Sequence, residues 1–268
     1  MATDLLSIAS SGAKAARAAL DITSQNIANV STEGYVRRSV DLKEVAPSTA
    51  FGQVGSLSGV RVAGVTRHAD AFRLAEARRT GSDAARANAE LGGVEKVESS
   101  LENAQVYDAI GNFEKALEGL TADPTNSSLR SAVLESAGTM SRAFNIASTS
   151  LQSTAEGLQF EASAGVDEVN GYAQELAKIN LRLARAQNGS TDQSALLDQR
   201  DQMLQKLAEH ADISVTVAAN YTVEVRLGSG GATPLVQGGT AAQLSMTTAT
   251  DGTVAFDLAG SPVTLSGG

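Results

Sequence analysis

Residues 23–37, TSQNIANVSTEGYVR, separate a helical pattern of apolar residues from an alternating pattern that is typical of strands. Upstream, apolar residues recur every three or four positions in two adjacent rows, which predicts a helix over about the first 30 residues. The first row, our candidate assembly surface, comprises Leu6, Ala9, Ala13, Ala16, Leu20 and Ile27. The second row comprises Leu5, Ile8, Gly12, Ala15, Ala19 and Ile22. Two rows are too wide for a single two-stranded seam, so the helix belongs either to an ordinary core or to a surface that packs against several neighbours.

The period of the sequence changes after this helix. Gly34 is typical of a residue that ends a helix. Polar and apolar side chains then alternate over residues 35–42, and they alternate again over residues 60–64. The stretch between these two segments is rich in turn residues, namely Pro47, Gly52, Gly55 and Gly59. We therefore predict two strands joined by a loop, in the form of a long hairpin or ribbon.

Helical periods dominate residues 68–210. A short amphipathic segment ends at Pro124, a residue that cannot continue a helix. Over residues 133–183 apolar side chains recur every three or four positions, and a helix of about 50 residues would span roughly 75 Å. A turn at residues 188–190 precedes a final helix that ends near His210. These lengths predict an elongated antiparallel helical bundle.

The last part of the chain has the pattern of β structure. Apolar residues alternate over residues 213–227, a glycine cluster at residues 228–231 predicts a hairpin turn, and residues 254–263 suggest further strands. No closing element follows, so we expect an incomplete β domain with open edges. The predicted fold class is α+β. The expected domains are an N-terminal assembly helix and β ribbon (1–67), an elongated, mainly α-helical bundle (68–211) and the start of a truncated β-rich domain (212–268).

Composition and charge exclude several classes of function. The chain has a net charge of -9, whereas nucleic-acid binding needs a clustered excess of Lys and Arg, so we expect no nucleic-acid partner. The absence of Cys excludes disulfides and thiolate metal sites. The N-terminus lacks the pattern of a cleaved signal peptide, and no apolar run reaches the roughly 18 residues of a membrane span. Positive and negative charges balance over residues 1–60, so this Ala-rich end is suited to association rather than to solubility.

Candidate catalytic and metal-binding residues are few. His68 and His210 belong to no metal-binding spacing, and we expect surface or capping roles for them. The glycines at residues 228–231 lack the Gly-Lys-Ser/Thr ending of a phosphate loop. Asp198 and Asp201 lie three apart on one helix face, where acid–base chemistry is open to them, but a solvated or ion-paired role on a polar helix flank is favoured. We therefore expect no enzyme, no cofactor and no metal ion.

Residues 23–37 resemble the N-terminal signature of flagellar axial proteins, in which the pattern S-x-N-I-A-N-x-x-T-x-G-Y-x-R follows an apolar helix. The matching residues are Ser24, Asn26, Ile27, Ala28, Asn29, Thr32, Gly34, Tyr35 and Arg37. A second segment, residues 196–204, resembles the L-L-D-Q-R-D-x-L segment of the hook-associated protein 1 family, which also precedes a β domain. Its matching residues are Leu196, Leu197, Asp198, Gln199, Arg200 and Asp201. The long helices between the two motifs fit that family, and rod and hook subunits lack them.

The resemblance covers the N-terminal portion of such a family member and implies a structural subunit of the bacterial flagellum at the junction of hook and filament, which assembles through its N-terminal helix. The implied partners are copies of itself in a ring, the hook protein, the next hook-associated protein and the flagellar export apparatus. The implied location is extracellular, on the flagellum, after export without a cleaved signal peptide. In that family the N-terminal helix pairs with a C-terminal helix, and this sequence shows no C-terminal amphipathic helix. Two alternatives remain: a hook or rod axial subunit, and a coiled-coil secreted adhesin or partner-binding module.

Overall fold

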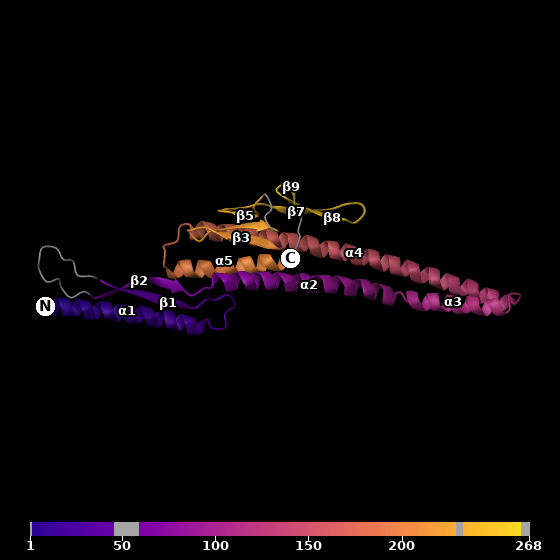
Figure 1. Cartoon of the computed structure of the whole chain (residues 1–268), viewed down its shortest axis with the longest axis horizontal. Coiled ribbons are helices and arrows are strands. Elements are labelled where there is room, and N and C mark those ends of the chain that lie inside the picture. Colours follow the sequence, from indigo (N-terminus) through magenta and orange to yellow (C-terminus); the bar gives the residue numbers. More distant parts are fainter. Residues whose placement is uncertain (1, 46–58, 229–232, 264–268) are drawn as a thin grey trace. The chain divides into compact units, whose positions relative to one another are not determined.

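The structure is a computed structural model that describes residues 2–45, 59–228 and 233–263. Most of these residues are helical and the strands form small sheets, so the predicted α+β class with a mainly helical bundle is confirmed (Figure 1). Contacts divide the chain into two compact units. The first unit comprises Met1–Asp83, Val169–Ser245 and Phe256–Gly268, and the second comprises Ala84–Glu168 and Met246–Ala255. The division into residues 1–67, 68–211 and 212–268, which follows the order of the sequence, stays a prediction.

The predicted N-terminal helix is α1 (Ala2–Ala28), which belongs to the first unit. It ends at Ala28, within two residues of the predicted end near residue 30. The backbone N–H and the side-chain Nδ2 of Asn29 both donate to the carbonyl oxygen of Gln25, at 3.0 Å and 2.9 Å. Gly34 has a φ of +74° and reverses the chain ahead of the first strand, a conformation that glycine adopts without steric cost.

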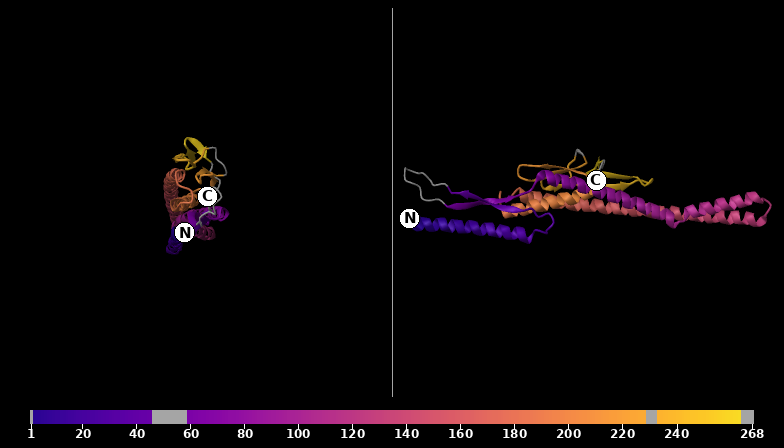
Figure 2. Two further views of the ribbon diagram at one scale, coloured as in Figure 1. Left: turned by 90° about the vertical axis from the view of Figure 1, so that its left-hand side faces the viewer. Right: turned by 60° about the horizontal axis from the view of Figure 1, so that its bottom comes forward.

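The predicted ribbon consists of β1 (Arg38–Glu44) and β2 (Val60–Arg67), which pair antiparallel. Most of the predicted loop between them, including Pro47, lies outside the described residues. The pairing shifts after Asp41 because Ala63 is an extra residue in β2, which makes a β-bulge. α1 lies along this ribbon in both directions of view (Figure 1 and Figure 2), so helix and ribbon form one layer each of a small two-layer element.

The remainder of the first unit is built on the C-terminal part of α4 (Ser127–Leu183). This helix is continuous over 57 residues, so the predicted long helix is confirmed. α5 (Thr191–His210) follows the predicted turn, and its first turn is capped by Ser190, whose side-chain oxygen accepts a hydrogen bond from the Gln193 N–H. The two helices share a buried cluster that comprises Ile179, Leu183, Leu196 and Leu197, and Leu176 of α4 and Leu204 and Leu207 of α5 are also fully buried.

Two sheets contain the predicted C-terminal strands. The four-stranded sheet has the order β3-β4-β5-β6, with bounds Ile213–Val217, Val223–Leu227, Val236–Gln237 and Thr240–Ala241. The three-stranded sheet has the order β7-β8-β9, with bounds Leu244–Thr248, Val254–Leu258 and Ser261–Val263. The predicted turn at residues 228–231 lies mostly outside the described residues.

Two asparagines of α4 hold these strands by their backbone groups. Asn180 is 1% exposed, and its Nδ2 donates to the carbonyl oxygens of Val223 and Gly238 (2.8 Å each) while its Oδ1 accepts from the Val223 N–H (2.9 Å). Asn170 contacts the N–H and carbonyl oxygen of Leu244 in the same way, both at 2.8 Å. Each amide satisfies the backbone groups that a neighbouring strand would otherwise pair. The C-terminal part of α4 is therefore joined to the strands by polar contacts as well as by apolar packing.

The second unit contains the end of α2 (Ala71–Asn103), α3 (Val106–Ala122) and the start of α4. α3 ends just before Asp123-Pro124, as predicted. The buried side chains in the core of the second unit are small, namely Ala104, Val106, Ala109, Ala143 and Ala147. An ion pair between Lys96 and Glu161 (2.6 Å) joins α2 to α4 at the surface.

Candidate functional site

The candidate assembly surface is an exposed apolar row on α1. All six of its residues are exposed: Leu6, Ala9, Ala13, Ala16, Leu20 and Ile27. The largest side chains, Leu6, Leu20 and Ile27, are 72%, 67% and 70% exposed. A helix that served only the core of its own chain would bury its apolar row. The row is therefore exposed among the residues that the structure describes, and its role as an assembly surface stays a prediction.

The second apolar row of α1 packs within the chain. Ala15 and Ile22 are buried where α1 lies against β1 and β2. The Ser11 hydroxyl accepts a hydrogen bond from the N–H of Val60 (3.2 Å), which fixes the start of β2 on the helix. The exception is Leu5, which lies near the N-terminus and is exposed. The two rows thus have different environments, one against the ribbon and one at the surface.

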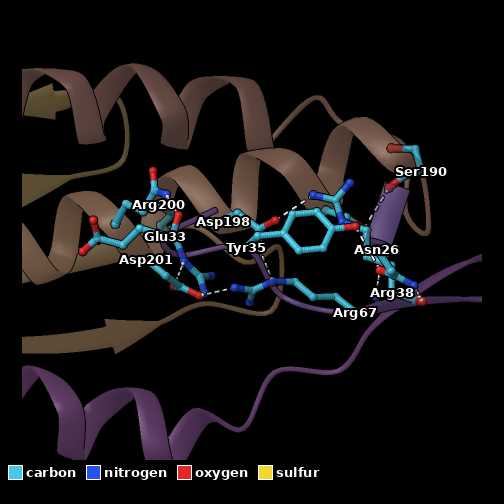
Figure 3. A network of polar contacts seen from close by, with 11 residues as sticks. Asn26, Glu33, Tyr35, Arg38, Arg67, Ser190, Asp198, Arg200 and Asp201 are labelled. Atoms are coloured by element: carbon cyan, nitrogen blue, oxygen red, sulfur yellow. Dashed lines mark hydrogen bonds and ion pairs between the residues drawn. The ribbon is translucent and has the colours of Figure 1, made fainter. Parts of the chain in front are cut away.

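The signature residues Asn26 and Tyr35 join the end of α1 to the start of the ribbon (Figure 3). Asn26 donates from Nδ2 to the carbonyl oxygen of Arg38 (2.8 Å) and accepts at Oδ1 from the Arg38 N–H (3.0 Å). The Tyr35 hydroxyl donates to the same Oδ1 (2.9 Å), and the Arg38 guanidinium lies 5.0 Å from the Tyr35 ring centroid. These contacts fold the chain back so that β1 begins beside the last turn of α1.

Other signature residues shape the turn between helix and ribbon. The Thr32 hydroxyl donates to Oδ1 of Asn29 (3.2 Å), and Nε2 of Gln202 donates to the carbonyl oxygen of Glu33. A Cβ at Gly34 would require the flexible Gln202 side chain to shift, and the positive φ of Gly34 favours glycine at this position. The remaining signature residues are exposed, namely Ser24, Ile27, Ala28 and Arg37.

A buried set of ion pairs joins the ribbon to α5. We call it the arginine–aspartate clasp, and it consists of Arg38, Arg67, Asp198, Arg200 and Asp201 (Figure 3). Asp198 accepts from Nη2 of Arg38 and from Nε of Arg67, both at 2.6 Å. Asp201 accepts from Nη2 of Arg67 (2.8 Å) and from Nη2 of Arg200 (2.7 Å). The five side chains therefore form a continuous chain of opposite charges.

The clasp corrects the sequence-based interpretation of the two aspartates. Asp198 and Asp201 are 7% and 8% exposed, so the expected solvated flank is wrong, whereas the expected ion pairing is observed. Their helix face is polar in sequence but is covered by the ribbon. Buried ion pairs contribute modest net stability compared with apolar packing, but loss of one partner costs about 3–5 kcal/mol because the other charge stays buried. The clasp therefore fixes where the ribbon docks.

The other residues of the second motif have separate roles. Leu196 and Leu197 pack in a buried cluster with Ile179 and Leu183 of α4. Gln199 is exposed. Nη1 of Arg200 donates to the carbonyl oxygen of Tyr221 (2.9 Å), which links the clasp to the turn between β3 and β4. The motif thus anchors α5 in its core on one side and holds the ribbon on the other.

Sequence reasoning missed the two arginines of the ribbon. Arg38 and Arg67 are opposite each other in the register of β1 and β2, at the end of the ribbon that meets α5. The available signal was a positive residue at each end of a predicted hairpin, together with two acidic residues on a later helix. No spacing rule connects residues that lie 160 positions apart, as Arg38 and Asp198 do.

The contacts described above join segments of the chain to one another. No group of three or more His, Asp or Glu side chains that could hold a metal ion occurs among the described residues. Nε2 of His68 lies 2.7 Å from the Ser39 hydroxyl, and the His210 ring lies 5.9 Å from that of Tyr172. None of the helices that the structure describes is long and apolar enough to cross a membrane.

Models of two known protein families match this chain. The family model described as the flagellar hook-associated protein FlgK helical domain matches residues 91–268. A second family model, described as the flagella basal body rod protein, matches residues 6–35, which contain the exposed row and every signature residue except Arg37.

Individual relatives agree with the family models. Flagellar hook-associated protein 1 of Escherichia coli (strain K12) is 29% identical over 249 residues, which cover 91% of this chain and 45% of that protein. The protein of the same name from Bacillus subtilis (strain 168) is 28% identical over 214 residues, covering 75% of this chain and 42% of that protein. The chain thus spans less than half the length of these curated relatives.

A solved structure shows the same fold. The flagellar hook junction protein FlgK from Burkholderia pseudomallei aligns with a TM-score of 0.56 and 21% sequence identity, over 69% of this chain and 33% of that one. The helical-domain model covers more than half of the sequence, from the end of α2 to the last residue. The chain belongs to the family of the flagellar hook-associated protein FlgK.

Proposed function

We propose that this chain is a structural subunit of the bacterial flagellum at the junction of hook and filament, and that it assembles through the exposed row of α1. The names of its relatives, which denote a place in a structure, support this role over a catalytic one. The observation that carries the proposal is the division of α1 into a row packed on the ribbon and a row of large apolar side chains at the surface. Such a surface gains free energy when it is buried against another subunit.

The size of the row favours contact with several neighbours. Full burial of a leucine or isoleucine contributes about 1.5–3 kcal/mol, and Leu6, Leu20 and Ile27 are the large members of the row. Association of two proteins loses about 4–15 kcal/mol of translational and rotational free energy. The free energy gained by burying this row in a single contact is therefore about equal to the free energy lost on association. A closed ring or tube repeats the contact around every subunit.

The clasp has a positioning role in this proposal. α1 packs on the ribbon, and the ribbon is bound to α5 by Arg38 and Arg67. The direction of the exposed row is therefore set by buried ion pairs rather than by α1 alone. A subunit must present this row at a defined angle to its neighbours, and an ion-paired contact specifies geometry better than small apolar side chains do.

The partners that we propose follow from the family. They are copies of the chain in a ring, the hook protein, the next hook-associated protein and the flagellar export apparatus. We also propose an extracellular place on the flagellum, reached by export without a cleaved signal peptide. A hook or rod subunit is less well supported, because the rod-protein model matches only residues 6–35 while the hook-associated model matches residues 91–268.

The test is a substitution on the exposed row in a flagellated host. Leu20→Asp and Ile27→Asp place a charge where apolar contact is needed, and we expect hooks without filaments and loss of swimming. Ser10→Asp is the matched control, because Ser10 is exposed on the polar side of the same helix. Circular dichroism of the purified variants should show unchanged helix content, since both target side chains are exposed. Normal filaments and normal swimming in Leu20→Asp cells would contradict the proposal.

A further inference from the structure

Asparagine followed by glycine is a chemically labile pair, and the chain contains two such pairs, Asn170-Gly171 and Asn188-Gly189. The backbone nitrogen of the glycine attacks the side-chain carbon Cγ of the asparagine, and glycine has no side chain to hinder this approach. Each pair is therefore a candidate for spontaneous deamidation, and the local structure decides whether the reaction occurs.

Deamidation at Asn188 needs no reagent other than water. The Gly189 nitrogen loses its proton and bonds to Cγ of Asn188, the bond between Cγ and Nδ2 breaks, and ammonia leaves with that proton. Water then opens the succinimide ring. Addition at Cγ gives aspartate, whereas addition at the backbone carbonyl carbon gives isoaspartate, in which the main chain is longer by one methylene. Both products carry a new negative charge, and no atom is oxidised or reduced.

Asn188 lies in the turn that joins α4 to α5, and it is exposed to water. The Ser190 N–H donates to the carbonyl oxygen of Gln187 (3.2 Å), and Gly189 has a φ of +72° whereas the φ of Asn188 is not positive. These are the features of a type II turn, in which ψ of the second residue is about +120°. The Gly189 nitrogen then lies away from the Asn188 side chain, so the peptide unit between the two residues must rotate before the ring closes.

The side chain of Gln193 opposes this rotation by holding both reacting groups. Gln193 is buried, at 6% exposed. Its Oε1 accepts from the Gly189 N–H (2.8 Å), and its Nε2 donates to Oδ1 of Asn188 (3.1 Å). Rotation of the peptide unit would break the first of these bonds and leave a buried amide oxygen without a partner, which is unfavourable. Gln193 therefore keeps the attacking nitrogen and its target apart.

Strand β2 holds the same turn from another side. The Val65 N–H donates to the carbonyl oxygen of Gly189 (2.7 Å). A Cβ at Gly64 would lie 3.1 Å from that oxygen, so the two backbones are packed too closely for additional atoms. The ribbon is in turn bound to α5 through Arg67. The turn is thus free to rearrange only when the ribbon leaves it, and a turn lengthened by isoaspartate would no longer fit against β2.

Asn170 is protected in a way that does not involve the ribbon. Asn170 and Gly171 lie inside α4, where the helical conformation fixes the peptide unit between them. The Asn170 side chain is bound to both backbone groups of Leu244, at 2.8 Å each. Opening of the ribbon should therefore leave Asn170 unreactive, which makes it an internal control for Asn188.

We propose that Asn188 is a deamidation site that Gln193 and the docked ribbon protect, and that undocking of the ribbon releases. The reaction makes the opening irreversible, because the isoaspartate product displaces the Gly189 carbonyl oxygen from Val65. The proposal concerns the turn and the ribbon, so it does not depend on assembly through α1.

The test follows deamidation of the purified full chain in mildly alkaline buffer, which favours loss of the proton from the Gly189 nitrogen. Peptide mass spectrometry measures the replacement of the side-chain amide by a carboxyl group at Asn188 and at Asn170 in the same sample, and enzymatic methylation detects isoaspartate. In the folded wild type Asn188 should react at least about tenfold more slowly than in urea, because the reaction requires local opening.

Gln193→Leu keeps a side chain of similar size and removes both hydrogen bonds to the turn. Asn188 should then react about tenfold faster than in the wild type, while Asn170 keeps its rate. Gln205→Leu is the matched control, because it makes the same change at an exposed position of α5, and it should leave both rates unchanged. Arg67→Gln weakens the docking of the ribbon with Gln193 intact. It should also accelerate Asn188 alone, and it carries the test if Gln193→Leu does not fold.

Three results would overturn the proposal: a rate at Asn188 in the folded wild type equal to that in urea, an unchanged rate at Asn188 in folded Gln193→Leu or Arg67→Gln, or an equal acceleration at Asn170. The deamidated fraction of the wild type, separated by ion exchange, tests the consequence for the ribbon. Its β2 peptides should exchange hydrogen faster than those of the unmodified chain, and equal exchange would overturn the irreversibility of the opening.

Discussion

Replacement of Asp198 by asparagine tests whether the clasp holds the ribbon. The carboxylate of Asp198 accepts from Arg38 and Arg67 at 2.6 Å, and all three side chains are at most 10% exposed. Asp198→Asn keeps the shape but removes the charge, and it turns one acceptor into a donor that faces a guanidinium donor. Both arginines then remain buried with less negative charge beside them.

The expected cost follows from the loss of one partner in a buried pair. That loss is worth about 3–5 kcal/mol. Since about 1.4 kcal/mol corresponds to a factor of ten, local opening of the ribbon should become about two to three and a half orders of magnitude more frequent. The effect should be local, because α5 keeps its apolar contacts through Leu204 and Leu207.

Hydrogen exchange measured by mass spectrometry reads this opening directly. Peptides that cover β1 and β2 should lose protection in Asp198→Asn, while peptides that cover β4 keep theirs. Glu209→Gln is the matched control, since it makes the same chemical change at an exposed position on the same helix. Exchange of the ribbon within twofold of the wild-type rate, or an equal change in Glu209→Gln, would refute the reasoning.

Two further substitutions test the packing contacts. Asn180→Ala removes a buried amide that bonds to the backbone of Val223 and Gly238. The free energy of unfolding, measured in urea, should fall by about 3 kcal/mol. A fall below about 1 kcal/mol would show that these backbone groups find other partners. Gly64→Ala places a Cβ 3.1 Å from the carbonyl oxygen of Gly189, a rigid backbone atom, so the Tm should fall. Gly157→Ala, in open space on α4, should raise the Tm because alanine favours a helix by about 1 kcal/mol; shifts of the same sign in both glycine variants would contradict the contact analysis.

Local signals were sufficient to predict most of the helices and strands, but not β5, β6 and β7. The long apolar track predicted α4, and Pro124 and the turn at residues 188–190 predicted where helices stop. The break between α2 and α3 lacks such a signal. Gln105 adopts a φ of +52°, which is unusual for a residue other than glycine, and it does so between Ala104 and Val106, both of which are buried. Tertiary packing, rather than local preference, sets this boundary.

The candidate site was only partly predictable for the same reason. The signature residues were found by their pattern, and the exposed row of α1 by its period. The burial of Asp198 was not predictable, because the segment Asp198-Gln199-Arg200-Asp201 is polar throughout and becomes buried only when the ribbon covers it. Charge pairs between distant segments depend on the completed fold, whereas helical periods are contained in a single window of sequence.

Three asparagine side chains each form hydrogen bonds to both the N–H and the carbonyl oxygen of one strand residue. They are Asn26, Asn170 and Asn180. A strand that slid by one position would present the wrong edge of its backbone and lose donor and acceptor together. Alignment is thus decided by three amides, whereas the tightness of packing is decided by the strand side chains. The two properties can change independently during evolution, so relatives can exchange apolar residues along these strands and still fold in the same register.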